Sequence, residues 1–234
     1  MKKSKLVTCM LLIATLSVAC VQITDPDVSE IEALQVLAEQ GDERSQFDLA
    51  LLYASLGDGR MTEYWFTRVA EQGNAKAQLN LGMLYFDGLR VPQNLEQAEY
   101  WFRKSAEQAF PFSFFYLGLL YHTGLGVEQN FESALYWYRK AAEYDVFLAW
   151  TNLGMMYDGG LGVPQSYEQS AYWFRKAAEQ GEATAQNNLG VAYRDGEGVL
   201  QDYEQAAYWL RRAIDQGYFR AQVNLEMLPA QYRY

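Results

Sequence analysis

The sequence predicts an all-α fold in which helix-turn-helix repeats stack into a solenoid. Five tryptophans stand 36 residues apart, at Trp65, Trp101, Trp137, Trp173 and Trp209. Four tyrosines keep the same spacing, at Tyr85, Tyr121, Tyr157 and Tyr193. A period of about 20–50 residues is the signature of a repeat array, in which each repeat contacts only its neighbours. The chain is therefore expected to bury one long apolar seam.

Helix starts recur with the same period. Seven residues before each tryptophan lies a residue that favours the N-cap of a helix: Asp58, Asn94, Asn130, Ser166 and Asp202. Side-chain oxygens of these residue types accept hydrogen bonds from the N–H groups that a helix start leaves unpaired. In three repeats a glutamine follows three residues later, as in a capping box: Gln97, Gln169 and Gln205. The tryptophans are therefore placed in the second helix of each repeat.

Residues 1–19 are predicted to be a secretory signal peptide. Lys2, Lys3 and Lys5 precede an apolar stretch over residues 6–18. This stretch is shorter than the about 20 apolar residues that a membrane span needs, and its order of charged and apolar parts is typical of a signal peptide.

The end of that segment resembles the lipobox of bacterial lipoproteins. Residues 16–20 read Leu-Ser-Val-Ala-Cys. The resemblance implies that Cys20 is lipidated and begins the mature chain, with a tether over residues 20–28. Val21 stands where an inner-membrane retention signal has aspartate, so the resemblance implies a periplasm-facing protein of the outer membrane. An ordinary signal peptide with an incidental cysteine is the alternative.

The solenoid is predicted over residues 29–234. A capping helix is expected over residues 29–41, since Ser29 and Glu32 form a capping box and Gly41 suits a left-handed helix end. Five repeats follow at 42–73, 74–109, 110–145, 146–181 and 182–217, and then a half repeat at 218–234. Glycines also close the second helices at Gly73, Gly181 and Gly217, whereas Ala109 and Asp145 take that position in two repeats.

Two segments of the second repeat recur in the others. Residues 77–85 read Ala-Gln-Leu-Asn-Leu-Gly-Met-Leu-Tyr, and residues 98–104 read Ala-Glu-Tyr-Trp-Phe-Arg-Lys. They resemble the Sel-1-like repeat, a relative of the tetratricopeptide repeat. Later repeats also carry its Gly-x-Gly-Val turn, where the second repeat has Arg90 instead of the second glycine. The resemblance implies a right-handed α-α superhelix with a concave groove lined by the first helices.

A row of asparagines is the first candidate binding site. Asn80, Asn152, Asn188 and Asn224 each precede the repeated leucine, and Asp48 and Tyr116 interrupt the row. A carboxamide both donates and accepts hydrogen bonds, so such a row can hold an extended peptide backbone. The alternative is that these side chains bridge the backbone of neighbouring helices.

Apolar residues beside this row form the second candidate. Residues 110–116 read Phe-Pro-Phe-Ser-Phe-Phe-Tyr, where the first, second and fifth repeats are more polar. Rigid aromatics and adaptable methionines suit a surface that binds a protein or peptide. The expected contact residues are Phe112, Phe115, Tyr116, Met83, Phe86 and Met155, with Trp150 extending the surface. The alternative is that these aromatics fill the interior.

Composition argues against several classes of function. The chain has 29 acidic against 19 basic residues, and signal cleavage would remove three lysines. Nucleic acid is an improbable partner, because phosphate binding needs basic patches. The only cysteines, Cys9 and Cys20, allow no disulfide framework, and the single histidine, His122, has no partner at metal-ligand spacing. We therefore expect no metal, no cofactor and no nucleic acid.

These patterns favour a non-enzymatic protein-interaction scaffold of the bacterial envelope that binds a peptide or protein in its groove. One alternative is an immunity-type inhibitor of a secreted antibacterial toxin. A more remote alternative is an envelope polymer hydrolase with Asp158 and Asp195 as its acid and base.

The lipobox yields a direct test. Cys20→Ser is expected to abolish labelling by a fatty-acid analogue and to release the protein from membranes, because the only acyl acceptor would be lost. Labelling and membrane fractionation measure both effects. Unchanged membrane retention would contradict the lipoprotein assignment.

Overall fold

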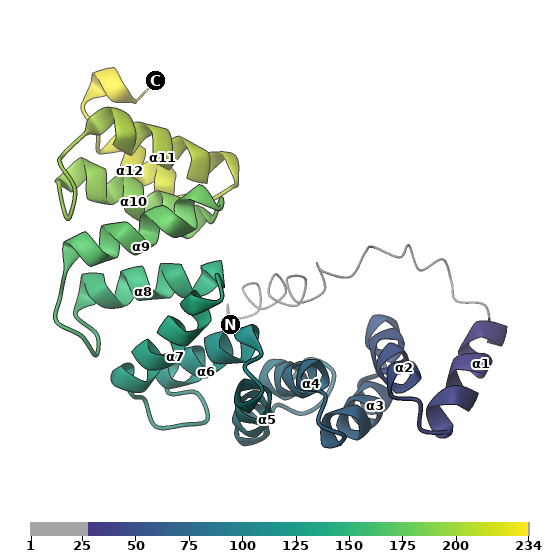
Figure 1. The fold of residues 1–234 in the computed structure, drawn as a ribbon. Coiled ribbons are helices and arrows are strands. Elements are labelled where there is room, and N and C mark those ends of the chain that lie inside the picture. Colours follow the sequence, from purple (N-terminus) through teal and green to yellow (C-terminus); the bar gives the residue numbers. More distant parts are fainter. Residues whose placement is uncertain (1–27, 234) are drawn as a thin grey trace. The chain divides into compact units, whose positions relative to one another are not determined.

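The computed structural model describes residues 28–233, and every regular element in that range is a helix (Figure 1). The predicted all-α fold class is confirmed. The helices are α1 Val28–Glu39, α2 Glu43–Leu56, α3 Gly59–Glu71, α4 Ala75–Asp87, α5 Leu95–Glu107, α6 Pro111–Thr123, α7 Phe131–Glu143, α8 Phe147–Gly159, α9 Tyr167–Glu179, α10 Ala183–Asp195, α11 Tyr203–Asp215 and α12 Arg220–Glu226, followed by the 3-10 helix η1 Ala230–Tyr232. The predicted signal peptide, Cys20 and nearly all of the tether lie outside the described residues.

The chain divides into two compact units at a sequence position within α5, so that one unit ends at Trp101 and the other begins at Phe102. In the first unit α1 packs on α2, α2 on α3 and α3 on α4. In the second unit α6–α7, α8–α9 and α10–α11 are tightly packed pairs, and α7–α8, α9–α10 and α11–α12 contacts join successive pairs. This is the stacking of consecutive helix pairs that the repeat period predicts.

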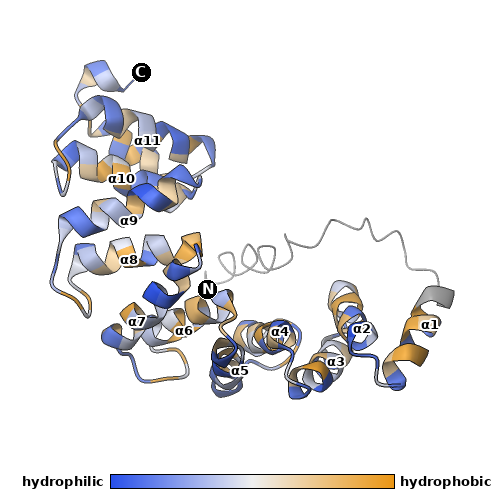
Figure 2. Cartoon of the chain, viewed as in Figure 1, coloured by the Kyte–Doolittle hydropathy of each residue, from blue (hydrophilic) through white to orange (hydrophobic). Residues whose placement is uncertain are grey.

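Apolar residues cover the helix that begins the described chain. Figure 2 shows hydrophobic colouring along much of α1. Ala38 and Leu34 of this helix pack into the core of the first unit, while Val36 is 53% and Leu37 48% exposed. Helix α1 lies in the range where the capping helix is expected, and Gly41 follows it with a φ of 97°.

All five predicted N-caps of the second helices are confirmed. In each, a side-chain oxygen accepts a hydrogen bond from the backbone N–H three residues later: Asp58 from Met61 at 3.0 Å, Asn94 from Gln97 at 3.1 Å, Asn130 from Ser133 at 2.8 Å, Ser166 from Gln169 at 3.3 Å and Asp202 from Gln205 at 3.0 Å. Local residue chemistry thus sets where each second helix begins.

The left-handed turn after each second helix is kept even without glycine. Gly73 and Gly181 have φ values of 97° and 92°, and Ala109 and Asp145 adopt 56° and 57° at the same position. A left-handed conformation costs a residue with a side chain about 1–2 kcal/mol. Packing of the repeats therefore overrides the local preference at these two turns.

A buried glutamine links successive helix pairs. The side-chain amides of Gln46, Gln78 and Gln186 donate to the backbone oxygens of Ala38, Ala70 and Ala178 at 2.9, 3.0 and 3.2 Å. Two repeats replace this glutamine by aromatics. Phe114 stacks on Trp137, with ring centroids 5.9 Å apart, and the Lys176 amine lies 4.2 Å from the centroid of the Trp150 ring. Trp150 is 5% exposed, so it belongs to the core and does not extend an exposed patch.

In the repeats of the second unit, the two helices approach each other at a glycine. A Cβ at Gly118 would lie 2.6 Å from the Tyr138 ring, and one at Gly154 would lie 2.5 Å from the Phe174 ring. Tyr138 and Phe174 are buried. The large ring of the second helix therefore occupies the space that the first helix leaves by having no side chain there.

Across residues 28–233, the structure contains no helix whose length and apolar character would let it cross a membrane.

Gly154→Ala is expected to destabilise the protein, although alanine favours helices. Overpacking against the buried Phe174 ring costs about 1–3 kcal/mol, which exceeds the roughly 1 kcal/mol gained in helix propensity. Thermal and urea unfolding measure the change.

Gly159→Ala is the matched control in the same helix. Gly159 is exposed, and the nearest neighbour of an added Cβ would be the Cγ of Leu161 at 3.3 Å. This change should leave stability unchanged or raise it by up to about 1 kcal/mol, because alanine favours helices. A Gly154→Ala protein as stable as the Gly159→Ala protein would show that the close approach is not a constraint.

Candidate functional site

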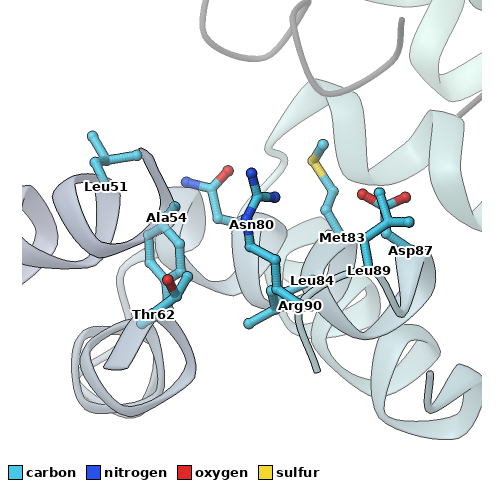
Figure 3. Close-up of a pocket in the computed structure, with 10 residues that line it drawn as sticks. Leu51, Ala54, Thr62, Asn80, Met83, Leu84, Asp87, Leu89 and Arg90 are labelled. Atoms are coloured by element: carbon cyan, nitrogen blue, oxygen red, sulfur yellow. The ribbon is translucent and has the colours of Figure 1, made fainter. Parts of the chain in front are cut away.

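A pocket in the first unit lies between α2 and α4, above α3 (Figure 3). It holds about 580 Å³, its open mouth included. Its walls are mostly apolar. They comprise Leu51 and Ala54 of α2, Thr62 and Phe66 of α3, Asn80, Met83, Leu84 and Asp87 of α4, and Leu89 and Arg90 of the following turn.

Helical spacing explains the wall that α4 contributes. Asn80, Met83, Leu84 and Asp87 stand at positions i, i+3, i+4 and i+7, which share one face of a helix. Gly88 then ends α4 with a φ of 63°. This left-handed turn brings the next two residues of the chain back to the pocket.

The second residue of that turn, Arg90, takes the place of a glycine in the repeat pattern. A Cβ at Gly59, the first residue of α3, would lie 1.9 Å from the backbone oxygen of Arg90. In the second unit the turn supplies the glycine and the helix supplies the larger residue. There a Cβ at Gly198 of the turn would lie 1.9 Å from the backbone oxygen of Tyr167, the first residue of α9. One glycine is needed at this contact, and either partner can supply it. The turn therefore tolerates arginine at position 90.

Three polar groups of this pocket have no hydrogen bond to other described residues: the side chains of Asn80, Asp87 and Arg90. Figure 3 shows the side chains of Asn80, Asp87 and Arg90 among the apolar residues that line the pocket. Burial raises the pKa of Asp87 to about 6, and the positive charge of Arg90 partly opposes this rise. The pocket thus combines apolar walls with an amide, an acid and a guanidinium that are available to a ligand.

The second unit has a pocket at the equivalent position, between α8 and α10 and above α9. It holds about 490 Å³, and it is lined by Met155, Asp158, Tyr167, Ser170, Phe174, Asn188, Val191, Ala192 and Glu197. Asn188 corresponds to Asn80 and Phe174 to Phe66 by the 36-residue period. The repeat therefore builds the same kind of pocket twice.

The structure divides the predicted asparagine row. Asn80 and Asn188 line the two pockets, and Asn188 also accepts a hydrogen bond from Asn187 at 3.0 Å. Asn152 donates to the backbone oxygen of Leu148 at 2.8 Å. Asn224 donates to Asn187 at 2.8 Å and accepts from Arg194 at 3.2 Å. Neither Asn152 nor Asn224 bridges to the backbone of a neighbouring helix, because Asn152 bonds within α8 and Asn224 bonds to side chains. Asn80 has no hydrogen bond to another described residue, so its amide is free for a ligand.

The predicted aromatic surface is divided as well. Phe115 is 1% and Tyr116 6% exposed, and Tyr116 stacks on Phe102 with ring centroids 4.8 Å apart. Their burial favours the interior-filling alternative for these two residues. Phe112 and Phe86 are half-buried. The two predicted methionines, Met83 and Met155, line the first and the second pocket.

Sequence reasoning missed the floor and the mouth of the pockets. Thr62 and Phe66 come from the second helix, whereas the resemblance implies a groove lined by the first helices, and Leu89 and Arg90 come from the turn. The departure of Arg90 from the Gly-x-Gly pattern was a usable signal.

The remaining titratable candidates have ordinary surroundings. His122 lies edge-on to Phe131 and Tyr138, and burial lowers its pKa. Asp195 is held by Arg194 at 2.6 Å. Asp158 lines the second pocket, whereas Asp195 does not. Among residues 28–233 no three His, Cys, Asp or Glu side chains gather in a way that could hold a metal ion.

Comparison with known proteins finds the Sel1 repeat at five places, residues 44–74, 75–110, 115–143, 151–182 and 183–218. No curated protein matches the sequence.

Several solved structures are similar. A protective antigen present in uropathogenic Escherichia coli strains, displaying an SLR fold, is 34% identical with a TM-score of 0.79 over 84% of this chain and 43% of that chain. A Sel1 repeat protein from Oxalobacter formigenes is 32% identical with a TM-score of 0.73 over 77% of this chain and 74% of that chain. This chain thus spans less than half of the Escherichia coli antigen.

The raised pKa of Asp87 makes stability depend on pH. Its folded-state pKa of about 6 lies above the ordinary value of 3.8. The contribution of this carboxyl to the free energy of unfolding is therefore fully present below pH 3.8 and is lost as pH rises through 6. At pH 7.5 the half-buried carboxylate costs on the order of 1–2 kcal/mol after allowance for solvent. Asp87→Asn is therefore expected to stabilise the protein at pH 7.5, and by about 1 kcal/mol less at pH 5. Urea unfolding at the two pH values measures the difference.

Asp48→Asn is the control, because the Asp48 carboxylate is exposed on α2. It should change stability little at either pH. An equal effect of Asp87→Asn at both pH values would contradict the assignment.

Proposed function

This chain belongs to the Sel1 repeat family, whose members are generally protein–protein interaction scaffolds, and we propose that it binds a peptide segment of a protein partner in the pocket beside Asn80. The observation that carries the proposal is the combination found there. Apolar walls from Leu51, Phe66 and Met83 surround an amide that no other described residue engages.

The pocket suits an apolar anchor side chain of the partner. Burying a leucine or methionine side chain contributes about 1.5–3 kcal/mol, and a hydrogen bond to the Asn80 amide adds about 1 kcal/mol. The amide both donates and accepts, so it can bind the backbone N–H and C=O of an extended segment. The entropy that the partner segment loses when it becomes ordered offsets part of this energy. One pocket therefore supports only weak binding, which neighbouring contacts must strengthen.

A binding role fits the polar groups of this pocket better than a catalytic one. Asn80, Asp87 and Arg90 include no nucleophile held by a general base. In the hydrolase alternative, the acid–base pair would consist of Asp158 and Asp195, of which Arg194 already engages the second. The proposal is therefore a non-enzymatic scaffold.

The proposal includes a place in the bacterial envelope. Its support is the sequence of residues 1–20, which resembles a lipoprotein signal ending at Cys20. The description of one similar protein as a protective antigen of Escherichia coli is in keeping with this location. The scaffold would then be held at the membrane by lipid and present its pockets to periplasmic proteins.

The test exchanges pocket residues for those that the chain itself uses elsewhere. Ala54→Asp with Leu89→Glu gives the first pocket the residues found at the equivalent positions of the second, Asp158 and Glu197. Two carboxylates should exclude an apolar anchor and weaken partner capture about 30-fold or more, which corresponds to about 2 kcal/mol. Quantitative mass spectrometry of pull-downs from detergent-solubilised envelopes measures the capture.

Leu200→Glu is the matched control. Leu200 is 92% exposed and lines neither pocket, so this variant should capture the same partner as the wild type. A pocket variant that folds and captures that partner equally well would rule out this pocket as the binding site.

A further inference from the structure

The two repeat-equivalent pockets differ in charge at matched positions. Ala54 lies six residues after Asp48 on its first helix, as Asp158 lies six residues after Asn152, so these two positions correspond. Leu89 in the turn corresponds to Glu197, three periods later. Arg90, which lines the first pocket, corresponds to Gly198. The first pocket therefore has one acid and one base among its lining residues, whereas the second has two acids and no base.

Both carboxylates of the second pocket are available. Neither the Asp158 nor the Glu197 side chain has a hydrogen bond or an ion pair with another described residue. The positive charge of Arg194 interacts with Glu197, but the guanidinium donates its hydrogen bonds to Asp195, Asn224 and Met227 at 2.6–3.2 Å. Burial raises the pKa of Asp158, as expected for a carboxylate without a counter-ion.

The rest of the second pocket is suited to an alkyl chain. Met155 and Val191 come from the two first helices, and the buried Phe174 ring forms the floor. The Tyr167 ring stands at the pocket and is 38% exposed, so its face can attract a cation. Lysine and arginine side chains have this dual character, because apolar methylenes carry a charged head.

We propose that the pocket of the second unit binds a lysine or arginine side chain of the protein partner, with its methylenes on Met155, Val191 and Phe174 and its charged head between Asp158 and Glu197. Charge complementarity selects this occupant over an apolar one, since an apolar side chain would bury two carboxylates without compensation. The inference rests on the proposed function and names the partner side chain that this second pocket takes.

Methionines in the two pockets make a direct test possible. Met155 lines the second pocket and Met83 the first. The full chain is labelled with ¹³C at the methionine methyl groups and titrated by NMR with Nα-acetyl-lysine N-methylamide or with the equally capped norleucine. The lysine probe should shift the Met155 signal with a Kd on the order of 10 mM, and the norleucine probe should shift it at least tenfold more weakly.

The variant Asp158→Ala with Glu197→Leu places in the second pocket the residue types that the first pocket has at the equivalent positions. The packing of the repeat therefore already accommodates an alanine and a leucine there. It should lose the Met155 response to lysine at least tenfold. Leu200→Glu, outside both pockets, should keep it. A Met155 signal that does not respond to lysine, responds equally to norleucine, or is unaffected by the double variant overturns the proposal.

These outcomes are separate from the test of the proposed function. If Ala54→Asp with Leu89→Glu still captures the envelope partner, the apolar pocket is not the site, whatever Met155 reports. If the Met155 response fails while the pull-down depends on the first pocket, the scaffold role stands and only the cationic pocket is wrong.

Discussion

The packing of the second unit depends on the close approach of the two helices of each of its repeats at a glycine. Gly118 and Gly154 leave room for the rings of Tyr138 and Phe174, so each second helix lies directly on its first helix. Interiors are close-packed, and a single added methyl group at such a point must displace a ring. Gly190 approaches Leu210 in the same way one period later, so these three repeats share the same internal packing.

Because the repeats are packed alike, equivalent positions have equivalent surroundings. The fold can therefore hold two pockets that differ only in the chemistry of their lining residues. Equivalent positions hold Ala54 and Leu89 in one unit but Asp158 and Glu197 in the other. The backbone contact at the mouth needs one glycine, supplied by Gly59 in the first unit. The protein can thus vary the chemistry of a pocket through two or three side chains without disturbing the packing beneath.

Local rules predicted the fold well and the site only partly. Asp58 and its counterparts cap helices because an N-cap needs only a side-chain oxygen and a nearby N–H group. The asparagine row was the right surface to consider, but Asn152 bonds within its own helix while Asn80 does not. Phe115 carried an apolar signal that fits an interior position as well as a binding surface, and it is buried.

By itself the sequence determined the all-α class, the repeat period and the helix starts, because these follow from spacing and from contacts a few residues apart. Only the tertiary structure decided which side chains remain available to a partner. A pocket such as the one beside Asn80 draws its walls from α2, α3, α4 and a turn. Whether a polar group there is free or already bonded depends on neighbours that are distant in sequence, and the 36-residue period does not specify those neighbours.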